Sequence, residues 1–259
     1  MLYKKYAKMH IKSAMEYKFN VMLLGFSSTL ISVSEIISVW LLFQNFESVG
    51  YWGFYETALM FGIVTTVFAI VETFARGYDE FATLIKDGTL DRLLVRPVNI
   101  HKQIFGSKIE LSRFGRVLLG LTVSIIALCN LAIEWTALKV LVLIMTFFCG
   151  CMVIFGLMLI TAGVSVFTVE NLEFLNILTH GSKELCYYPV NIYNKWLARF
   201  FTFVIPVACF NYLPISYIMG YGDLPQIVYA LSPLIGALFV VPCFLFFNWC
   251  LKKYQGTGT

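Results

Sequence analysis

The chain has 259 residues and a formal net charge of +4; 59% of its residues are hydrophobic and only 13% are charged. Soluble domains carry about 25% charged residues, so this composition excludes an ordinary water-soluble domain. The apolar residues fall in continuous runs of about 20, the length that crosses about 30 Å of hydrocarbon. The sequence therefore predicts an all-α integral membrane protein, with residues 1–259 forming a single transmembrane domain.

The N-terminal segment, residues 1–19, is basic and precedes the first apolar run. Lys4, Lys8 and Lys12 repeat every four residues, so they share one face of a helix. This pattern predicts an interfacial helix whose amines meet anionic lipid headgroups, although a polybasic retention signal fits equally well. Both interpretations place the segment in the cytoplasm. No small-residue cleavage site follows the first apolar run, so we expect that run to stay in the membrane.

Six apolar runs predict six spanning helices. If both termini are cytoplasmic, eighteen of the nineteen lysines and arginines lie on the cytoplasmic side, and only Lys139 lies outside. Such a bias sets the orientation of a membrane protein, so the sequence predicts cytoplasmic N- and C-termini. It also explains the positive charge without a nucleic-acid partner. The predicted spans cover residues 20–43, 54–76, 115–133, 137–167, 197–220 and 226–250.

The longest polar segment, residues 76–114, separates the second and third runs. Its residues 81–88 predict a short amphipathic helix closed by Gly88, because glycine adopts the left-handed conformation that caps a helix. In residues 89–97, leucines alternate with charged residues, and Pro97 prevents a further helical turn. Exposed leucines among charges are typical of a docking surface.

Residues 170–196 do not fit a simple pattern, because they mix charged side chains such as Glu170, Glu173 and Lys183 with apolar ones. They predict either a cytoplasmic surface helix or the polar half of a span with a re-entrant segment. Either element ends near Tyr188, because the residue before a proline is pushed out of helical geometry. Kinks are also predicted in or beside the last two runs, at Pro206, Pro214, Pro233 and Pro242.

The sequence offers no catalytic chemistry of its own. Its seven cysteines are odd in number and show no C-x-x-C spacing, so they predict small core residues rather than disulfides or metal ligands. No Gly-Lys dipeptide occurs, which excludes a phosphate-binding P-loop. We therefore expect no catalytic residue, cofactor or metal in this chain, and its energy must come from a partner chain or an ion gradient.

Three segments follow a known pattern. Residues 85–99 read Ile-Lys-Asp-Gly-Thr-Leu-Asp-Arg-Leu-Leu-Val-Arg-Pro-Val-Asn. They resemble the G-x-L-D-x-x-L-x-R-P-x-N segment of one branch of the ABC-2 superfamily of ABC export permeases. Residues 188–196 and 203–208 resemble the second signature of that branch, and residues 249–256 resemble its aromatic and glycine tail. This tail lacks the serine that the branch carries close to the tyrosine.

The resemblance implies the permease subunit of an ATP-driven ABC exporter in a bacterial plasma membrane. It implies an N-terminal surface helix, six membrane helices and a second, non-identical permease. Separate ABC ATPase subunits would bind ATP and Mg²⁺ and would dock on the cytoplasmic loop 76–114. The ATPase-coupling residues carried over by the resemblance are Gly88, Leu90, Asp91, Leu94, Arg96 and Pro97.

Acidic residues lie in or at the ends of the first two apolar runs: Glu35, Glu56 and Glu72. A carboxylate near the bilayer centre is costly unless it is protonated, paired or hydrated, which makes Glu35 a candidate functional residue. It either bonds a partner subunit across a polar helix face or lines the translocation path. The alternative to an exporter is a gradient-driven secondary transporter that uses Glu35 as its ion or proton site. A third hypothesis is a membrane scaffold without transport activity.

Overall fold

The computed structural model describes residues 2–168, 177–222 and 225–255, and the regular elements in these ranges are helices apart from one isolated bridge between Val49 and Trp52. Glu170, Glu173 and Gly256, which entered the sequence-based predictions, lie outside the described residues. The seven cysteines are free thiols, five of them buried, as expected for small core residues.

Among the described residues, five helical segments are long and apolar enough to cross a membrane. A sixth candidate is a bent pair, Lys195–Val204 and Val207–Met219, whose halves meet at 76°. The break lies at Pro206, which lacks the N–H group that a continuous helix needs. The prediction of an all-α integral membrane protein with about six spanning helices is confirmed. The five long segments are α2 (Lys18–Asn45), α3 (Phe54–Phe74), η1 with α8 (Leu111–Arg113 and Phe114–Asn130), α9 (Ala137–Thr168), and α14 with α15 (Gln226–Ala237 and Val240–Lys252).

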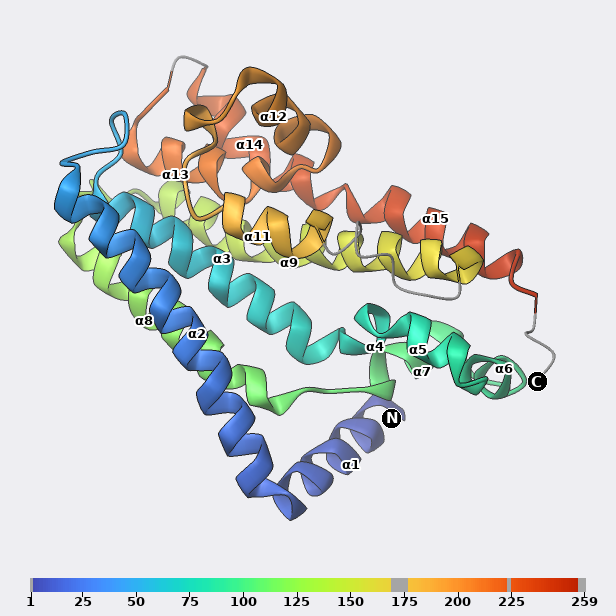
Figure 1. Cartoon of the computed structure of the whole chain (residues 1–259). Helices are drawn as coiled ribbons and strands as arrows, with labels where there is room; N and C mark the ends of the chain where they lie inside the picture. The colour runs from blue at the N-terminus through green and yellow to red at the C-terminus, as the bar shows by residue number, and fades with distance from the viewer. Residues whose placement is uncertain (1, 169–176, 223–224, 256–259) are drawn as a thin grey trace.

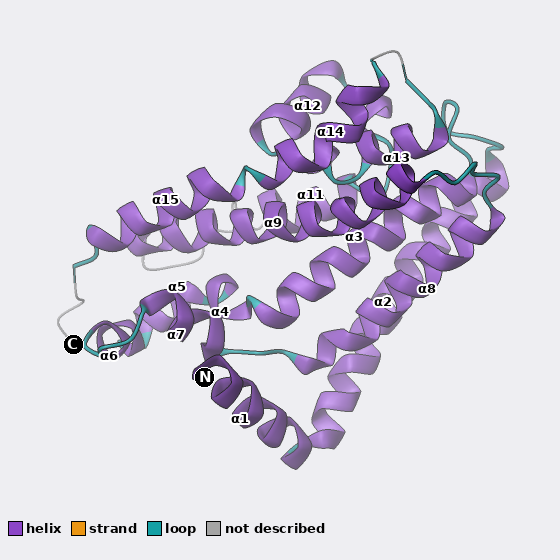
Figure 2. Cartoon of the chain, turned by 180° about the vertical axis from the view of Figure 1, so that it is seen from behind, coloured by secondary structure: helices purple, strands orange, loops and turns teal. Residues whose placement is uncertain are grey.

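Helix α3 is the centre of the bundle, with α2 and α8 along one side and α9, α14 and α15 along the other (Figures 1 and 2). The most apolar 18-residue stretch of α3 is 89% buried. The corresponding stretch of α2 is only 11% buried, so α2 lies on the outside of the bundle. Small residues let α3 and α8 approach closely: a Cβ on Gly62 would lie 2.3 Å from the Ser124 Oγ, and one on Gly120 would lie 2.5 Å from the Thr66 Oγ1. This is the usual packing of membrane helices, where van der Waals contact replaces the hydrophobic effect.

Helix α1 (Leu2–Glu16) diverges from the direction of α2 and lies against α7 (Ile100–Ser107), as Figure 1 shows. His10 Nε2 lies 3.0 Å from the Gly106 carbonyl oxygen. A Cβ on Gly106 would come within 2.7 Å of the Tyr6 ring, so only glycine permits this contact. The predicted N-terminal helix is therefore present and is anchored on the loop between the second and third spans, while its contact with lipid headgroups stays a prediction.

The predicted loop 76–114 is folded rather than extended. Gly88 has a φ of 62°, in the left-handed region, and lies between two short helices, as the sequence predicted. The rings of Phe81 and Phe247 are 5.3 Å apart, so the loop packs against α15. Before η1 the loop forms α4 (Arg76–Asp79), α5 (Phe81–Lys86), α6 (Thr89–Leu94) and α7.

Residues 177–185 fold between the long helices. They form a π-helical turn, η2 (Ile177–Gly181), and α11 (Ser182–Leu185), in which Ser182 and Lys183 are buried. The burial of Ser182 and Lys183 favours the re-entrant alternative over a cytoplasmic surface helix for these residues. Because Lys183 is buried, it is not one of the loop charges that indicate the orientation of the chain in the membrane. The chain then continues through η3 (Val190–Ile192), α12 (Lys195–Arg199), η4 (Phe200–Val204), η5 (Val207–Cys209) and α13 (Tyr212–Met219).

Candidate functional site

The loop of short helices exposes one continuous run, residues 94–99, which we call the docking run. The Leu94 side chain is 42% exposed and Val95 is 86% exposed, although both are apolar. Arg96 and Pro97 are exposed as well. Val95 was not among the predicted coupling residues, even though it is the most exposed apolar side chain of the run.

The other predicted coupling residues lie behind the docking run. Leu90 is fully buried, so the expectation that it forms an exposed docking leucine is wrong: Leu90 and Leu93 share the face of α6 that packs on the core. Asp91 is half-buried. Burial raises the pKa of Tyr254, and the nearby Asp91 carboxylate raises it further. Leu90 and Asp91 therefore lie in the interior of the loop, whereas Leu94, Arg96 and Pro97 are exposed on its surface.

Gln103 on α7 holds both ends of the docking run. Its Nε2 donates to the Leu93 carbonyl at 3.0 Å and to the Val98 carbonyl at 2.9 Å. Gln103 is 1% exposed, so water does not compete for these bonds. Asn99 caps α7 by accepting a hydrogen bond from the His101 backbone N–H at 3.0 Å. Gln103 was not predictable as a functional residue, because a glutamine in a short helix carries no specific signal in the sequence.

A polar bridge joins the loop to the last helix. The Tyr78 hydroxyl lies 2.9 Å from His101 Nδ1, and His101 Nε2 lies 2.9 Å from Asn248 Oδ1. Asn248 Oδ1 only accepts, so Nε2 carries the proton and Nδ1 accepts from the Tyr78 hydroxyl. Burial raises the pKa of Tyr78, which keeps that hydroxyl protonated and able to donate. The bridge thus connects α4, α7 and α15.

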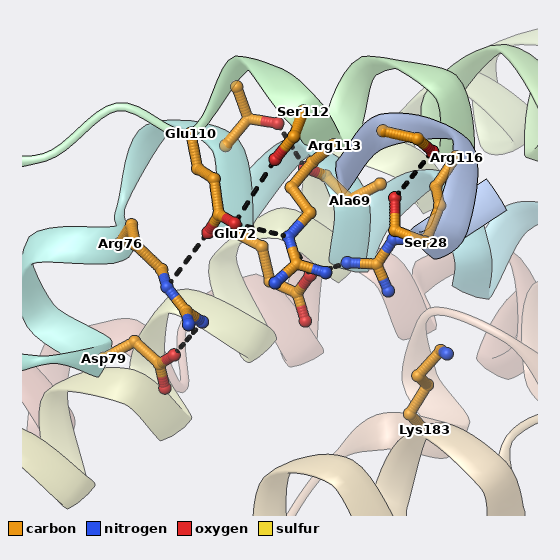
Figure 3. A network of polar contacts seen from close by, with 12 residues as sticks. Ser28, Ala69, Glu72, Arg76, Asp79, Glu110, Ser112, Arg113, Arg116 and Lys183 are labelled. Carbon is orange, nitrogen blue, oxygen red and sulfur yellow. Dashed lines mark hydrogen bonds and ion pairs between the residues drawn. The ribbon is translucent and has the colours of Figure 1, made fainter. Parts of the chain in front are cut away.

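Beneath the loop lies a network of charged side chains where α3 ends and α8 begins (Figure 3). Glu72 is 3% exposed and bonds the Arg116 guanidinium. Arg113 Nε lies 3.7 Å from Glu72 Oε2 and 3.3 Å from Glu110 Oε1. Arg76 Nε lies 3.1 Å from Glu110 Oε2 and so extends the network to α4. In the sequence, Glu72 stands out as an acidic residue at the end of an apolar run, whereas the arginines indicate only the membrane topology.

Glu35 lies in a second, partly buried cluster. Lys183 Nζ is 3.0 Å from Glu35 Oε1 and 3.2 Å from Oε2, and the Tyr187 hydroxyl donates to Oε2 at 2.8 Å. Lys183 Nζ also lies 5.5 Å from the centre of the Tyr187 ring, within the range of a cation–π contact. Both oxygens of Glu35 are therefore bonded within the chain, so its charge is paired without a partner subunit. A further bond from Glu35 to a partner subunit stays a prediction.

The comparison with protein families agrees with this architecture. The family described as ABC-2 family transporter protein matches residues 29–258. The chain belongs to the ABC-2 transporter family. No match was found among curated proteins. As an ABC-2 family protein, the chain is a multi-pass membrane component of a transporter, a kind of subunit that is generally not itself an enzyme. Within the described part of this ABC-2 protein, no cluster of three His, Cys, Asp or Glu side chains could hold a metal ion.

Proposed function

We propose that this chain is the permease subunit of an ATP-driven ABC exporter of the branch with the G-x-L-D-x-x-L-x-R-P segment. It pairs with a second, non-identical permease in a bacterial plasma membrane, with both termini in the cytoplasm. Separate ABC ATPase subunits bind ATP and Mg²⁺ and dock on the loop of short helices. The observation that supports this best is the docking run, which is exposed and yet held at both ends by Gln103. A surface ordered before binding loses little entropy when a partner docks.

The chemistry of the docking run suits a protein partner. Leu94 and Val95 offer apolar area, and Arg96 offers a guanidinium that can bond a carboxylate in two places. Apolar side chains near arginine are enriched at protein interfaces. In the proposed orientation this run lies in the cytoplasm, where ATP is available.

Two sets of contacts connect the docking run to the membrane helices. The Tyr78–His101–Asn248 bridge connects it to α15. The network around Glu72 and Arg116 connects the loop to α3 and α8. When the ATPase subunits close on ATP, the loop would move as one body with these three helices. This movement would open the path to one side of the membrane and then to the other.

The test is a mild-detergent purification of the tagged chain from its native membrane, followed by mass spectrometry of the proteins that co-purify. We expect a P-loop ATPase and a second permease with the unaltered chain. The double variant Leu94→Asp/Val95→Asp should lose the ATPase without losing thermal stability, because both side chains already face water. Thr83→Asp is the matched control, since Thr83 is exposed on α5 of the same loop. A chain that purifies alone, or a double variant that keeps the ATPase, would overturn the proposal.

The gradient-driven alternative depends on Glu35. Lys183 balances the Glu35 charge and Tyr187 donates a further hydrogen bond to it, so a proton or cation would have to displace Lys183 to bind this carboxylate. The alternative predicts substrate movement in vesicles under a proton gradient without ATP, and loss of this movement in Glu35→Gln. ATP-dependent transport without such a gradient would rule it out.

A further inference from the structure

A polar cavity of about 480 Å³ lies at the end of the bundle opposite the loop of short helices. The start of α3 forms one wall, the connection between α8 and α9 forms another, and the end of α13 closes it. Helix α3 begins at this cavity and ends at α4. Figure 1 shows the start of α3 and the helix α6 at opposite ends of the molecule, so the cavity lies far from the docking run. In the proposed orientation the cavity opens to the outside.

Charged side chains of both signs line the cavity: Glu56, Glu134 and Lys139. Glu56 is fixed, because its Oε2 accepts from the Gly53 N–H at 3.1 Å and its Oε1 accepts from the Tyr221 hydroxyl at 3.3 Å. Neither Glu134 nor Lys139 has an ion pair or side-chain hydrogen bond among the described residues. Each therefore keeps its full bonding capacity for a ligand.

Lys139 is unusual for two reasons. It is the one basic residue that the predicted topology places outside, against the bias of the basic residues in the predicted cytoplasmic segments. It also lies in the first turn of the 32-residue helix α9, where the helix dipole disfavours a cation and favours an anion. Thr136 Oγ1 caps the helix by accepting from the Lys139 backbone N–H at 3.3 Å, and a bound anionic group would pair with the Lys139 ammonium group and interact favourably with the helix dipole. Glu134 and Glu56, on the other walls, suit an ammonium group.

Exposed aromatic side chains next to the lining residues indicate the depth of lipid headgroups. The Tyr51 ring lies 5.3 Å from that of the lining residue Tyr221, and Tyr55 and Trp135 directly adjoin Glu56 and Glu134 in the sequence. Tyr51, Tyr55 and Trp135 are 48%, 39% and 46% exposed. Exposed tyrosine and tryptophan side chains form belts at membrane–water interfaces. A ligand at this depth is held beside the headgroups of the outer leaflet.

We propose that this cavity binds a zwitterion that carries a primary ammonium and a phosphate, as in the headgroup of an ethanolamine phospholipid. The phosphate lies against Lys139 and the start of α9, and the ammonium group lies between Glu134 and Glu56. The same headgroup chemistry exists in free phosphoethanolamine, so the test includes both sources. This inference requires no ATPase partner.

The test measures binding to the purified full-length chain by native mass spectrometry and thermal unfolding, with added phospholipids that carry ethanolamine, choline or glycerol headgroups. We expect the ethanolamine lipid to bind tightest, because choline lacks N–H donors and glycerol lacks the ammonium group. The variants Lys139→Ala and Glu134→Gln should each weaken its binding about tenfold, the effect of one charge-assisted hydrogen bond. The control is Glu47→Gln, since Glu47 is exposed near the same end but does not line the cavity.

A competition experiment with free phosphoethanolamine shows whether the ligand is the phospholipid or the soluble zwitterion. If phosphoethanolamine stabilises the chain and competes with the lipid, the cavity recognises the headgroup alone and also accepts the soluble zwitterion. If only the lipid binds, acyl chains beside the cavity contribute. Equal binding of the three lipids, or unchanged binding in both cavity variants, would overturn the proposal.

Discussion

Lys183 on α11 and Glu35 on α2 meet with 3.0 Å between Nζ and Oε1, although 148 positions separate them in the sequence. Their side chains are 8% and 22% exposed, and the surrounding elements are apolar helices. The pair therefore fixes the segment around α11 against the first long helix. A buried ion pair is costly to break on one side, because the remaining charge then has no partner.

We predict that Glu35→Gln and Lys183→Gln each lower the free energy of unfolding by about 3–5 kcal/mol. The double variant should lose less than the sum of the two, because neither charge is left alone. Unfolding curves in mixed micelles measure these differences as a double-variant cycle. Glu47→Gln serves as the exposed control and should change stability by less than about 0.5 kcal/mol. Additive losses would show that Glu35 and Lys183 do not stabilise the fold as a pair.

The close packing of α3 and α8 leads to a second prediction. A Cβ on Gly120 would lie 2.5 Å from the Thr66 Oγ1 and 2.8 Å from the Thr66 backbone nitrogen. Gly120→Val should therefore force the two helices apart and cost about 1–3 kcal/mol. Leu121→Val, on the exposed face of the same helix, is the matched control. Equal melting temperatures for the two variants would contradict the close approach.

The spans were predictable because bilayer thickness is a length constraint that each helix meets within its own sequence. The kink at Pro206 was predictable for a similar reason, since proline acts on its own helix. Pairings between distant segments were not predictable. Nothing near Glu35 indicates that its partner is Lys183, because the pair forms only when the segment around α11 folds back between the long helices.

The docking run shows the same limit at shorter range. Leu90 and Leu94 belong to the same short run of leucines and charged residues, yet Leu90 is fully buried and Leu94 is 42% exposed. Helix α6 has only six residues, too few for its hydrophobic pattern to show which face packs inward. The prediction of exposed leucines was therefore correct for Leu94 and wrong for Leu90.

The two hydrogen bonds from Gln103 to the backbone around the docking run lead to a third prediction. Gln103→Leu removes two hydrogen bonds and leaves the carbonyls of Leu93 and Val98 without these donors. We expect a stability loss of about 1–3 kcal/mol and faster protease cleavage within residues 94–99. ATPase recovery from native membranes should fall, because the run then becomes ordered only on binding. Lys102→Gln, an exposed change on α7, should leave cleavage unchanged. If the protease cleaves residues 94–99 no faster in Gln103→Leu than in the unaltered chain, Gln103 does not hold the docking run in place.

The bond from His101 to Asn248 connects the loop to the last helix and can be tested with a closely matched control. Asn248 Nδ2 donates to the Phe244 carbonyl of its own helix, while Oδ1 accepts from His101 Nε2. The Asn130 side chain makes the same bond within its own helix, to the Ile126 carbonyl. Among the described residues, this is the only hydrogen bond of the Asn130 side chain. Asn248→Leu and Asn130→Leu therefore lose the same local bond, but only the first breaks the bridge.

We predict that amide hydrogen exchange in α7 is about fivefold faster in Asn248→Leu, the effect of about 1 kcal/mol, and unchanged in Asn130→Leu. In the complex with its ATPase, Asn248→Leu should keep the partner bound but reduce transport per ATP hydrolysed, because docking and α15 are no longer rigidly connected. Loss of the ATPase itself would instead indicate a damaged docking run. If the amide hydrogens of α7 exchange at the same rate in Asn248→Leu, the bridge does not stabilise the contact between the loop and α15.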